Sequence, residues 1–281
     1  MSLSFQTNIT SLEAQNSLQV NTNSLDNAIQ QLTSGYRINK SGDDAAGLAV
    51  ANGLRSNVTE LQQGVGNAND GSAILQTIDG GLNNISNILD QLQTLATQSA
   101  SGTFSGNRAT LNEQFQTLLG EINRQAANIG LASGGGSTPS SQFNNNLEVY
   151  IGGGSTQANS QVTIALSGSA NTVDSLGLGI SSDAVDTAAH AQTAINDISN
   201  AVQALGLVQG TVGDGENDLN YAIGLANSQI TNESAAESNI RDANVAQAAA
   251  ALTQGQVLQQ SGVAALAQAN SEPQALLKLL P

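Results

Sequence analysis

The chain has 281 residues, 2% aromatic side chains and a formal net charge of −15, a composition poorly suited to one large globular core. Because lysine and arginine drive phosphate binding, seven basic residues against 22 acidic ones argue against a nucleic-acid partner. The chain has no cysteine, which excludes disulfides, thiolate metal sites and cysteine nucleophiles.

The first ten residues, MSLSFQTNIT, lack the basic stretch and apolar run of a cleaved secretory signal. No stretch approaches the roughly 20 apolar residues of a membrane span. We therefore expect no membrane insertion. If the protein is extracellular, we expect it to leave the cell by a route without such a signal.

The first predicted helix carries a leucine every seven residues, at Leu18, Leu25 and Leu32. This spacing is typical of a coiled-coil seam, and it predicts a helix from about Leu3 to Ser34. The pattern stops at Gly35 and resumes after Asp44.

The second predicted helix is long, because its apolar residues recur at helical spacing from Leu54 to Ala96. Glycines at 64, 66, 71, 80 and 81 lie inside it, and each costs about 1 kcal/mol relative to alanine in an isolated helix. We therefore expect other elements to pack along this helix, with its small residues allowing close approach.

The next elements are a short helix and a hairpin. The stripe from Leu111 to Ile129, after a possible N-cap at Asn107, predicts a third helix antiparallel to the second. Alternating apolar residues predict a β-hairpin over residues 147–166, with its apolar face on the helices. We place this hairpin at the distal end of the long helices.

The returning half of the chain is again helical. Ser181 or Ser182 is the predicted cap of a fourth helix, and a final heptad-like helix follows the segment RDANVA. His190 has no obvious ligand partner and is expected on the helix surface. The acidic segment GDGEND (213–218) lacks the spacing of a calcium loop and is expected to be helical. The fold class is therefore mainly α, a long antiparallel helical coiled-coil rod with a small β-hairpin.

The terminal helices are rich in Asn, Gln, Ser and Ala, and their thin leucine seam cannot keep them ordered alone. We expect them to become ordered among other copies of the chain, as in a polymer subunit. The predicted assembly residues, expected to pack within and between subunits, are Ile9, Leu12, Leu18, Leu25, Ile29, Leu32, Leu252, Leu258, Val263, Leu266, Leu276 and Leu280.

The charged segment between the first two helices is interpreted as a joint. Asp43 and Asp44 are adjacent in sequence, so their side chains diverge and cannot share a metal or a proton. Helix capping, with Arg37 and Lys40 as charge partners, is the favoured role. We expect no catalytic site, metal or cofactor, and the joint residues are Gly35, Arg37, Lys40, Gly42, Asp43 and Asp44.

Five segments then carry a family resemblance. TNITSLEAQNSL (7–18), LTSGYRINKSGDDAAGLAVANGL (32–54), NANDGSAILQT (67–77), LATQSASGT (95–103) and QVLQQSGVAALAQANSEPQALLKLL (256–280) resemble, in order, the signature segments of bacterial flagellin. The resemblance implies an inner terminal-helix coiled coil (1–35 and 243–281), a spoke linker (36–44) and an outer helical domain (45–242).

This resemblance also implies function, partners and location. Flagellins self-assemble into the extracellular filament that propels swimming bacteria, after flagellar type III export. The implied partners are other copies of the chain, a filament cap, hook-filament junction proteins and an export chaperone. Two alternatives stay open, a hook-filament junction protein and a helical adhesin that does not polymerise. The AQAN and PQALL segments favour flagellin over the first, and electron microscopy of regrown filaments would distinguish the second.

The chain departs from the family where many flagellins carry two arginines and a glutamate. Gln91, Gln93 and Thr94 stand there, in a patch that the resemblance assigns to recognition by the vertebrate Toll-like receptor for flagellin. Amides cannot replace the charge-assisted bonds of guanidinium groups. We therefore expect weak or absent activation of that receptor in a reporter-cell assay.

Overall fold

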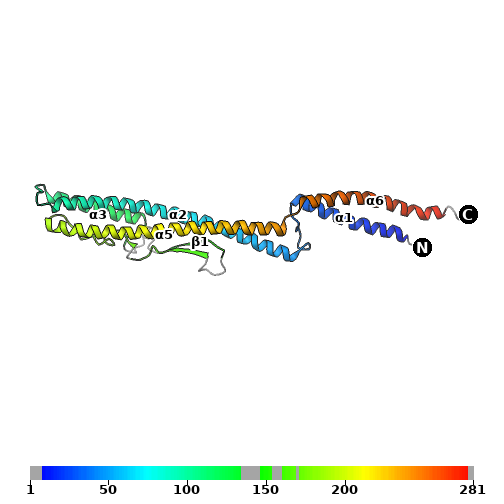
Figure 1. Cartoon of the computed structure of the whole chain (residues 1–281), viewed down its shortest axis with the longest axis horizontal. Coiled ribbons are helices and arrows are strands. Elements are labelled where there is room, and N and C mark those ends of the chain that lie inside the picture. The colour runs from blue at the N-terminus through cyan, green and yellow to red at the C-terminus, as the bar shows by residue number, and fades with distance from the viewer. Residues whose placement is uncertain (1–7, 134–145, 154–159, 169–170, 278–281) are drawn as a thin grey trace. The chain divides into compact units, whose positions relative to one another are not determined.

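The structure, a computed structural model, describes residues 8–133, 146–153, 160–168 and 171–277. In these ranges the predicted mainly α fold with a small hairpin is confirmed. The helices are α1 (Ile9–Ser34), α2 (Ala45–Ala100), α3 (Arg108–Asn128), α5 (Ala188–Arg241) and α6 (Val245–Leu277), and the strands are β1 (Leu147–Tyr150) and β2 (Gln161–Ile164) (Figure 1).

The chain forms two compact units. Unit 1 combines residues 1–56 with 231–281, and unit 2 contains residues 57–230. The long helices α2 and α5 contribute residues to both units. Because the ends of the chain meet in unit 1, its folding depends on contacts between residues more than 200 positions apart.

Helix α1 has well-defined ends. It begins at Ile9, because the side chain of Asn8 accepts a hydrogen bond from the Ser11 amide and caps the helix. The predicted start at Leu3 is therefore wrong. Helix α1 ends as predicted at Gly35, whose φ of 75° lies in the left-handed region that favours glycine.

Unit 2 has a continuous core built by α2, α3 and α5. Gly81 of α2 faces Ile129, just after the end of α3, and Gly71 of α2 faces Leu219 of α5. The side chain of Gln209 also donates to Asn83 across α5 and α2 at 3.4 Å. The predicted antiparallel return of α3 on α2 is confirmed. The largest α2 side chains in this core, each at most 1% exposed, are Leu61, Leu75, Ile78, Leu82, Ile85, Leu89 and Leu92.

The hairpin pairs as predicted, with Val149 opposite Val162 and Leu147 opposite Ile164. Its place at the distal end is wrong. The Tyr150 hydroxyl donates to Glu60 at 2.6 Å, and the Asn67 side chain donates to the Tyr150 carbonyl at 3.0 Å. The hairpin therefore lies beside the start of unit 2, far along α2 from the turn at residues 101–107.

Glycines explain this position of the hairpin. Gly71 of α2 faces Val149, and Gly215 of α5 faces Ile164. At these two positions the helices carry no side chain, so the apolar face of the hairpin can lie close to their backbones. Gly215 belongs to the GDGEND segment, which is helical as predicted. Within this segment, Gly215 leaves space for Ile164 of the hairpin.

Two substitutions on α2 should have opposite effects. An alanine Cβ at Gly64 would overlap the backbone carbonyl of Ile151, whereas one at Gly80 would meet open space. We expect Gly64→Ala to lower the free energy of unfolding by about 2 kcal/mol through overpacking. Gly80→Ala should raise it by about 1 kcal/mol. Thermal unfolding of both variants tests this, and shifts of the same sign would contradict it.

Helix α5 begins later than predicted. Its first residue is Ala188, and the Thr187 hydroxyl accepts a hydrogen bond from the His190 amide at 3.1 Å. The predicted cap at Ser181 or Ser182 is therefore wrong. Residues on α2 and α3 hold the preceding segment, because Val185 donates to the Asn112 side chain and accepts a bond from the Ser99 hydroxyl.

Candidate functional site

The terminal helices α1 and α6 form an antiparallel pair within unit 1. Leu25 lies against Gly255, and Leu18 lies against Gly262. Polar contacts hold the same register, because the Asn21 side chain donates to the Gly255 carbonyl at 2.8 Å. Leucine on one helix thus fills the space that glycine leaves on the other.

Polar bonds continue this pairing at the start of α1. The Asn8 side chain donates to the Ala269 carbonyl, and the Ser11 hydroxyl donates to the Asn270 side chain, both at 2.8 Å. Ser11 is buried here. These bonds fix the register where large apolar side chains are missing from the seam.

The predicted assembly residues fall into two sets. Half-buried residues form the seam set, which is Leu18, Leu25, Leu32, Leu252 and Leu266. Residues that are 40–67% exposed form the outward set, which is Ile9, Leu12, Ile29, Leu258 and Val263.

Packing of the outward set inside the single chain was predicted, and that prediction is wrong. A pair of helices can cover only one stripe on each member, so the other apolar residues stay exposed. The backbone of Leu276 belongs to α6, and nothing is described of its side chain. Leu280 lies outside the described residues.

The joint between α1 and α2 is organised by its two aspartates. Asp43 accepts hydrogen bonds from the backbone amides of Asn39 at 3.0 Å and Lys40 at 2.9 Å. Asp44 accepts from the Gly47 amide at 2.8 Å and so caps α2. The amide bonds from Lys40 and Asn39 hold the pKa of the Asp43 carboxyl below its usual 3.8. Capping is thus the observed role.

Arg37 and Lys40 were predicted as charge partners of the two aspartates. Arg37 binds elsewhere, and the charge of Lys40 acts only weakly. The Arg37 guanidinium donates to the Ile240 carbonyl at 2.6 Å, not to an aspartate. Lys40 meets Asp43 through its backbone amide, and its ammonium adds only a minor attraction. Gly42 has open space around it. Backbone amides are therefore the main partners that order this loop.

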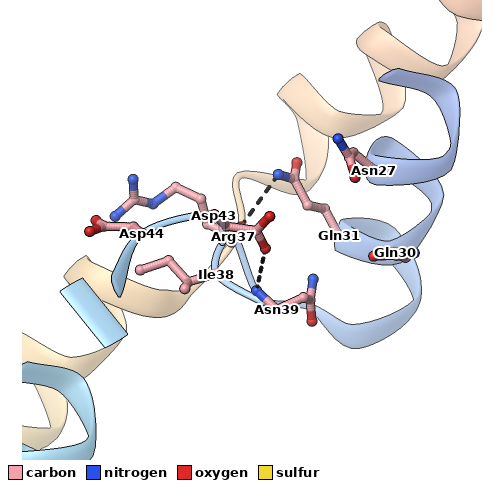
Figure 2. A pocket seen from close by; sticks show the side chains of 8 residues that line it. All are labelled: Asn27, Gln30, Gln31, Arg37, Ile38, Asn39, Asp43 and Asp44. Atoms are coloured by element: carbon pink, nitrogen blue, oxygen red, sulfur yellow. Dashed lines mark hydrogen bonds between the residues drawn. The ribbon is translucent and has the colours of Figure 1, made fainter. Parts of the chain in front are cut away.

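A polar pocket of about 260 Å³ lies between α1 and the joint. Figure 2 shows the side chains around it, with dashed lines marking the bonds from Gln31 to the Arg37 carbonyl and from Asn39 to Asp43. Ile38 is its one apolar residue and is only 1% exposed. Its lining residues are Asn27, Gln30, Gln31, Arg37, Ile38, Asn39, Asp43 and Asp44.

A second linker, between α5 and α6, pairs with the joint. The sequence patterns did not predict it. The Arg37 amide donates to the Arg241 carbonyl at 2.7 Å, and the Ala243 amide donates to the Gly35 carbonyl at 2.8 Å. Arg241 lies 4.1 Å from the centre of the Tyr36 ring, a cation–π contact. We call these residues, 35–37 with 241–243, the return clasp. It ties both connections between terminal and central helices together.

Gln91 and Thr94 line a groove of about 490 Å³ between α2 and α3, together with Leu95, Gln114, Thr117 and Leu118. No basic side chain is among these lining residues. Gln93 lies outside the lining, and its side-chain oxygen is buried without a hydrogen-bond partner. Weak recognition by the flagellin receptor stays a prediction.

His190 lies on the surface of α5, as predicted. The interpretation that it has no partner is wrong, because its Nδ1 lies 2.6 Å from Asp186 Oδ1. In the described part of the chain, no three His, Cys, Asp or Glu side chains cluster as metal ligands. Within the same residues, no helix is long and apolar enough to cross a membrane.

Comparison with known proteins gives two family matches. Residues 5–130 match the bacterial flagellin N-terminal helical region, and residues 190–280 match the bacterial flagellin C-terminal helical region. Together these matches cover the five segments whose resemblance was noted in the sequence.

Full-length relatives agree. The chain is 31% identical to a flagellin of Halalkalibacterium halodurans, over 97% of this chain and 98% of that protein. It is 32% identical to a flagellar filament core protein of Treponema maltophilum, with the same coverage. A Listeria monocytogenes flagellin is also 32% identical, over 98% of both chains. The protein therefore belongs to the bacterial flagellin family.

Proposed function

We propose that this chain is the structural subunit of a bacterial flagellar filament, with no enzymatic activity. The observation that carries the proposal is the outward set on α1 and α6. These residues are apolar, 40–67% exposed, and spread along both helices of the terminal pair. Neighbouring copies would bury them, and burying one leucine contributes roughly 1.5 to 3 kcal/mol. A flagellar filament core protein among the relatives supports the same role.

The two compact units suggest that different parts of the chain have different roles in the filament. Residues 1–35 and 243–281 would form the inner layer, in which the outward set meets other copies. Residues 36–44 would act as the spoke, held by the return clasp. Residues 45–242, with the hairpin at 147–166, would form the outer layer. Support comes from the core of unit 2, residues 57–230, which α2, α3, α5 and the hairpin build, while residues 45–56 and 231–242 group with the terminal helices in unit 1.

The remaining partners and the location follow from the same role. A filament subunit is extracellular and meets a cap at the growing tip, junction proteins at the hook and a chaperone before export. Export would use the flagellar type III route. The family matches favour this role over a junction protein or an adhesin that does not polymerise.

Seeded regrowth tests the proposed function. Filaments of this protein are dissociated by heat, and the monomer is mixed with short filament fragments and imaged by electron microscopy. A filament subunit should extend the fragments into long filaments. An adhesin would leave fragment length unchanged, and a junction protein would add only a short segment, so either result would overturn the proposal.

Unit 2 is strongly acidic, so assembly should depend on salt. It has fourteen Asp and Glu against two Arg, a net charge of −12. Arg124 already pairs with Glu121, and Arg108 donates to the carbonyls of Ser99 and Ser101. Copies brought side by side therefore repel one another, and salt screens this repulsion.

We expect seeded elongation to speed up about threefold or more as NaCl rises from about 20 to 200 mM. The double variant Asp214→Asn, Asp218→Asn removes two exposed charges from unit 2 and should elongate faster at low salt, with a weaker salt dependence. Light scattering measures both rates. Elongation that slows as salt is added would show that attraction between charges dominates.

A further inference from the structure

The pair of α1 and α6 carries the same repeat on both of its helices. The stripe on α1 has a leucine every seven residues, at Leu18, Leu25 and Leu32. The facing stripe on α6 has the same period and consists of small residues, which are Ala248, Gly255, Gly262 and Ala269. If α1 slid away from the joint by seven residues, Leu25 would face Gly262 and every leucine would again meet a small residue. The apolar seam therefore does not choose between these two registers.

Most polar bonds along the pair do not choose between them either. The Asn21 side chain donates to the Gly255 carbonyl, and after the shift it would lie level with the carbonyl of Gly262. A backbone carbonyl recurs at every residue, so it cannot mark one position. The bond from the Ser11 hydroxyl to the Asn270 side chain is specific to the observed register. It is one bond, to an exposed asparagine, at the end of the pair opposite to the joint.

The return clasp closes the other end of the pair, and its backbone bonds continue the observed register. The Arg37 amide donates to the Arg241 carbonyl at 2.7 Å, and the Ala243 amide donates to the Gly35 carbonyl at 2.8 Å. Between these two bonds, residues 36 and 242 form an antiparallel bridge. The two chains thus leave the helix pair already in register.

The side chains of the return clasp are not repeated seven residues away. Arg241 lies 4.1 Å from the centre of the Tyr36 ring, and the Arg37 guanidinium donates to the Ile240 carbonyl at 2.6 Å. Seven residues beyond Arg241 stands an alanine, residue 248, so a shifted Tyr36 would lose its cationic partner. The clasp therefore distinguishes the two registers where the leucine seam does not.

The linkers show which helix would slide if the clasp opened. Only residues 242–244 separate α5 from α6, whereas residues 35–44 separate α1 from α2. Seven helical residues rise about 10 Å, and ten extended residues span roughly 30 Å. The longer linker can therefore supply the shift, and α1 is the helix that can move.

We propose that the return clasp fixes the register of α1 on α6 and so prevents a slip of one heptad. The slip would displace the outward set of α1 by about 10 Å relative to that of α6. The clasp thereby determines which surface the terminal pair offers to a partner. The clasp and the helix pair belong to one chain, so the proposal does not rest on the filament role and is tested on the full-length monomer.

Competition between two disulfides measures the register. The chain has no cysteine, so Leu25→Cys, Gly255→Cys, Gly262→Cys introduces the only three. A Cβ at position 255 would lie 3.6 Å from the Cβ of Leu25, which suits a disulfide. A bond from position 25 to 255 reports the observed register, and a bond from 25 to 262 reports the slip. Positions 255 and 262 are about 10 Å apart on one helix and cannot bond to each other.

The protein is equilibrated in dilute solution with a glutathione redox buffer, and mass spectrometry of its peptides gives the ratio of the two disulfides. With the clasp intact, we expect the 25–255 bond to exceed the 25–262 bond by about tenfold or more. Equal amounts of the two bonds would overturn the proposal.

Two double variants in this background make the test specific. Tyr36→Ala, Arg37→Ala removes a cation–π contact and a charge-assisted hydrogen bond, and it should lower the ratio about tenfold. Tyr36→Phe, Arg37→Lys keeps a ring and a cationic donor, and its ratio should stay close to that of the intact clasp. Ser11→Ala removes the specific bond at the far end and should lower the ratio less than the double alanine variant.

Three results would contradict the role of the clasp. The first is a ratio that the double alanine variant leaves unchanged. The second is a parallel loss of both disulfides in that variant, which would show that the clasp holds the helices together without choosing their register. The third is a larger effect of Ser11→Ala, which would assign the register to the far end of the pair.

Discussion

A chain that lacks residues 1–20 is expected to stay monomeric where the full chain forms filaments. The deletion removes Leu18, which lies against Gly262, and Ser11, which donates to Asn270. It also removes two members of the outward set, Ile9 and Leu12. The part of α6 from Gly262 onward then lacks the residues of α1 that cover it, and a helical segment with so little apolar surface does not stay ordered alone. Sedimentation velocity and electron microscopy after seeding measure the outcome.

Unit 2 provides the control for this deletion. Its core contains no residue of α1, so its thermal unfolding should keep the same midpoint in the truncated chain. A truncated chain that forms filaments at the rate of the full chain would contradict the proposed role of the terminal pair.

Point variants can separate pairing from assembly. Leu258→Ser changes an outward residue of α6 that is 50% exposed, whereas Leu252→Ser changes a half-buried residue of the same helix. The first should keep the helix content measured by circular dichroism yet slow elongation about tenfold, the effect of roughly 1.4 kcal/mol. The second should lower the helix content as well. If both variants changed helix content and elongation rate equally, the distinction between the seam set and the outward set would be wrong.

The large elements of the fold could be predicted because their signals are local. Leu18, Leu25 and Leu32 repeat every seven residues, and all three are half-buried in the structure. The left-handed end of α1 at Gly35 follows from the freedom of glycine alone. The seven-residue repeat and the left-handed glycine depend only on residues that are close in sequence. They can therefore be predicted without knowing which helix packs against α1.

The partner surface of α6 was missed because it is made of small residues. Ala248, Gly255, Gly262 and Ala269 are also seven residues apart, and they provide the stripe that α1 covers. A search for large apolar residues passes over such a stripe and selects Leu258 and Val263, which face outward. The period of the small residues was the signal that could have found it.

Other features depend on contacts between distant residues. The return clasp joins Tyr36 to Arg241, and the hairpin position depends on which glycines of α2 and α5 face the hairpin. The late start of α5 reflects two bonds of Val185, whose carbonyl accepts from the Ser99 hydroxyl and whose amide donates to the Asn112 side chain. None of these contacts leaves a periodic trace in the sequence, so local patterns could not predict them.

The joint should fail when both of its aspartates are removed. In Asp43→Ala, Asp44→Ala, the amides of Asn39 and Lys40 lose their acceptor, and α2 loses the cap that binds the Gly47 amide. Loss of a helix cap alone costs about 1 kcal/mol. The linker then no longer holds one conformation, and we expect seeded filaments to be absent or altered in shape, as seen by electron microscopy.

A matched variant separates capping from charge. Asp70→Ala, Asp90→Ala removes two exposed charges from α2 without removing a cap, and it should form normal filaments. Acid offers a second check, because the pKa of Asp43 is lowered below 3.8 by its amide bonds. Its contribution is present above pH 3.8 and is lost as the pH falls further. If both double variants disturb the filament equally, the joint acts through its charge, and the capping role is wrong.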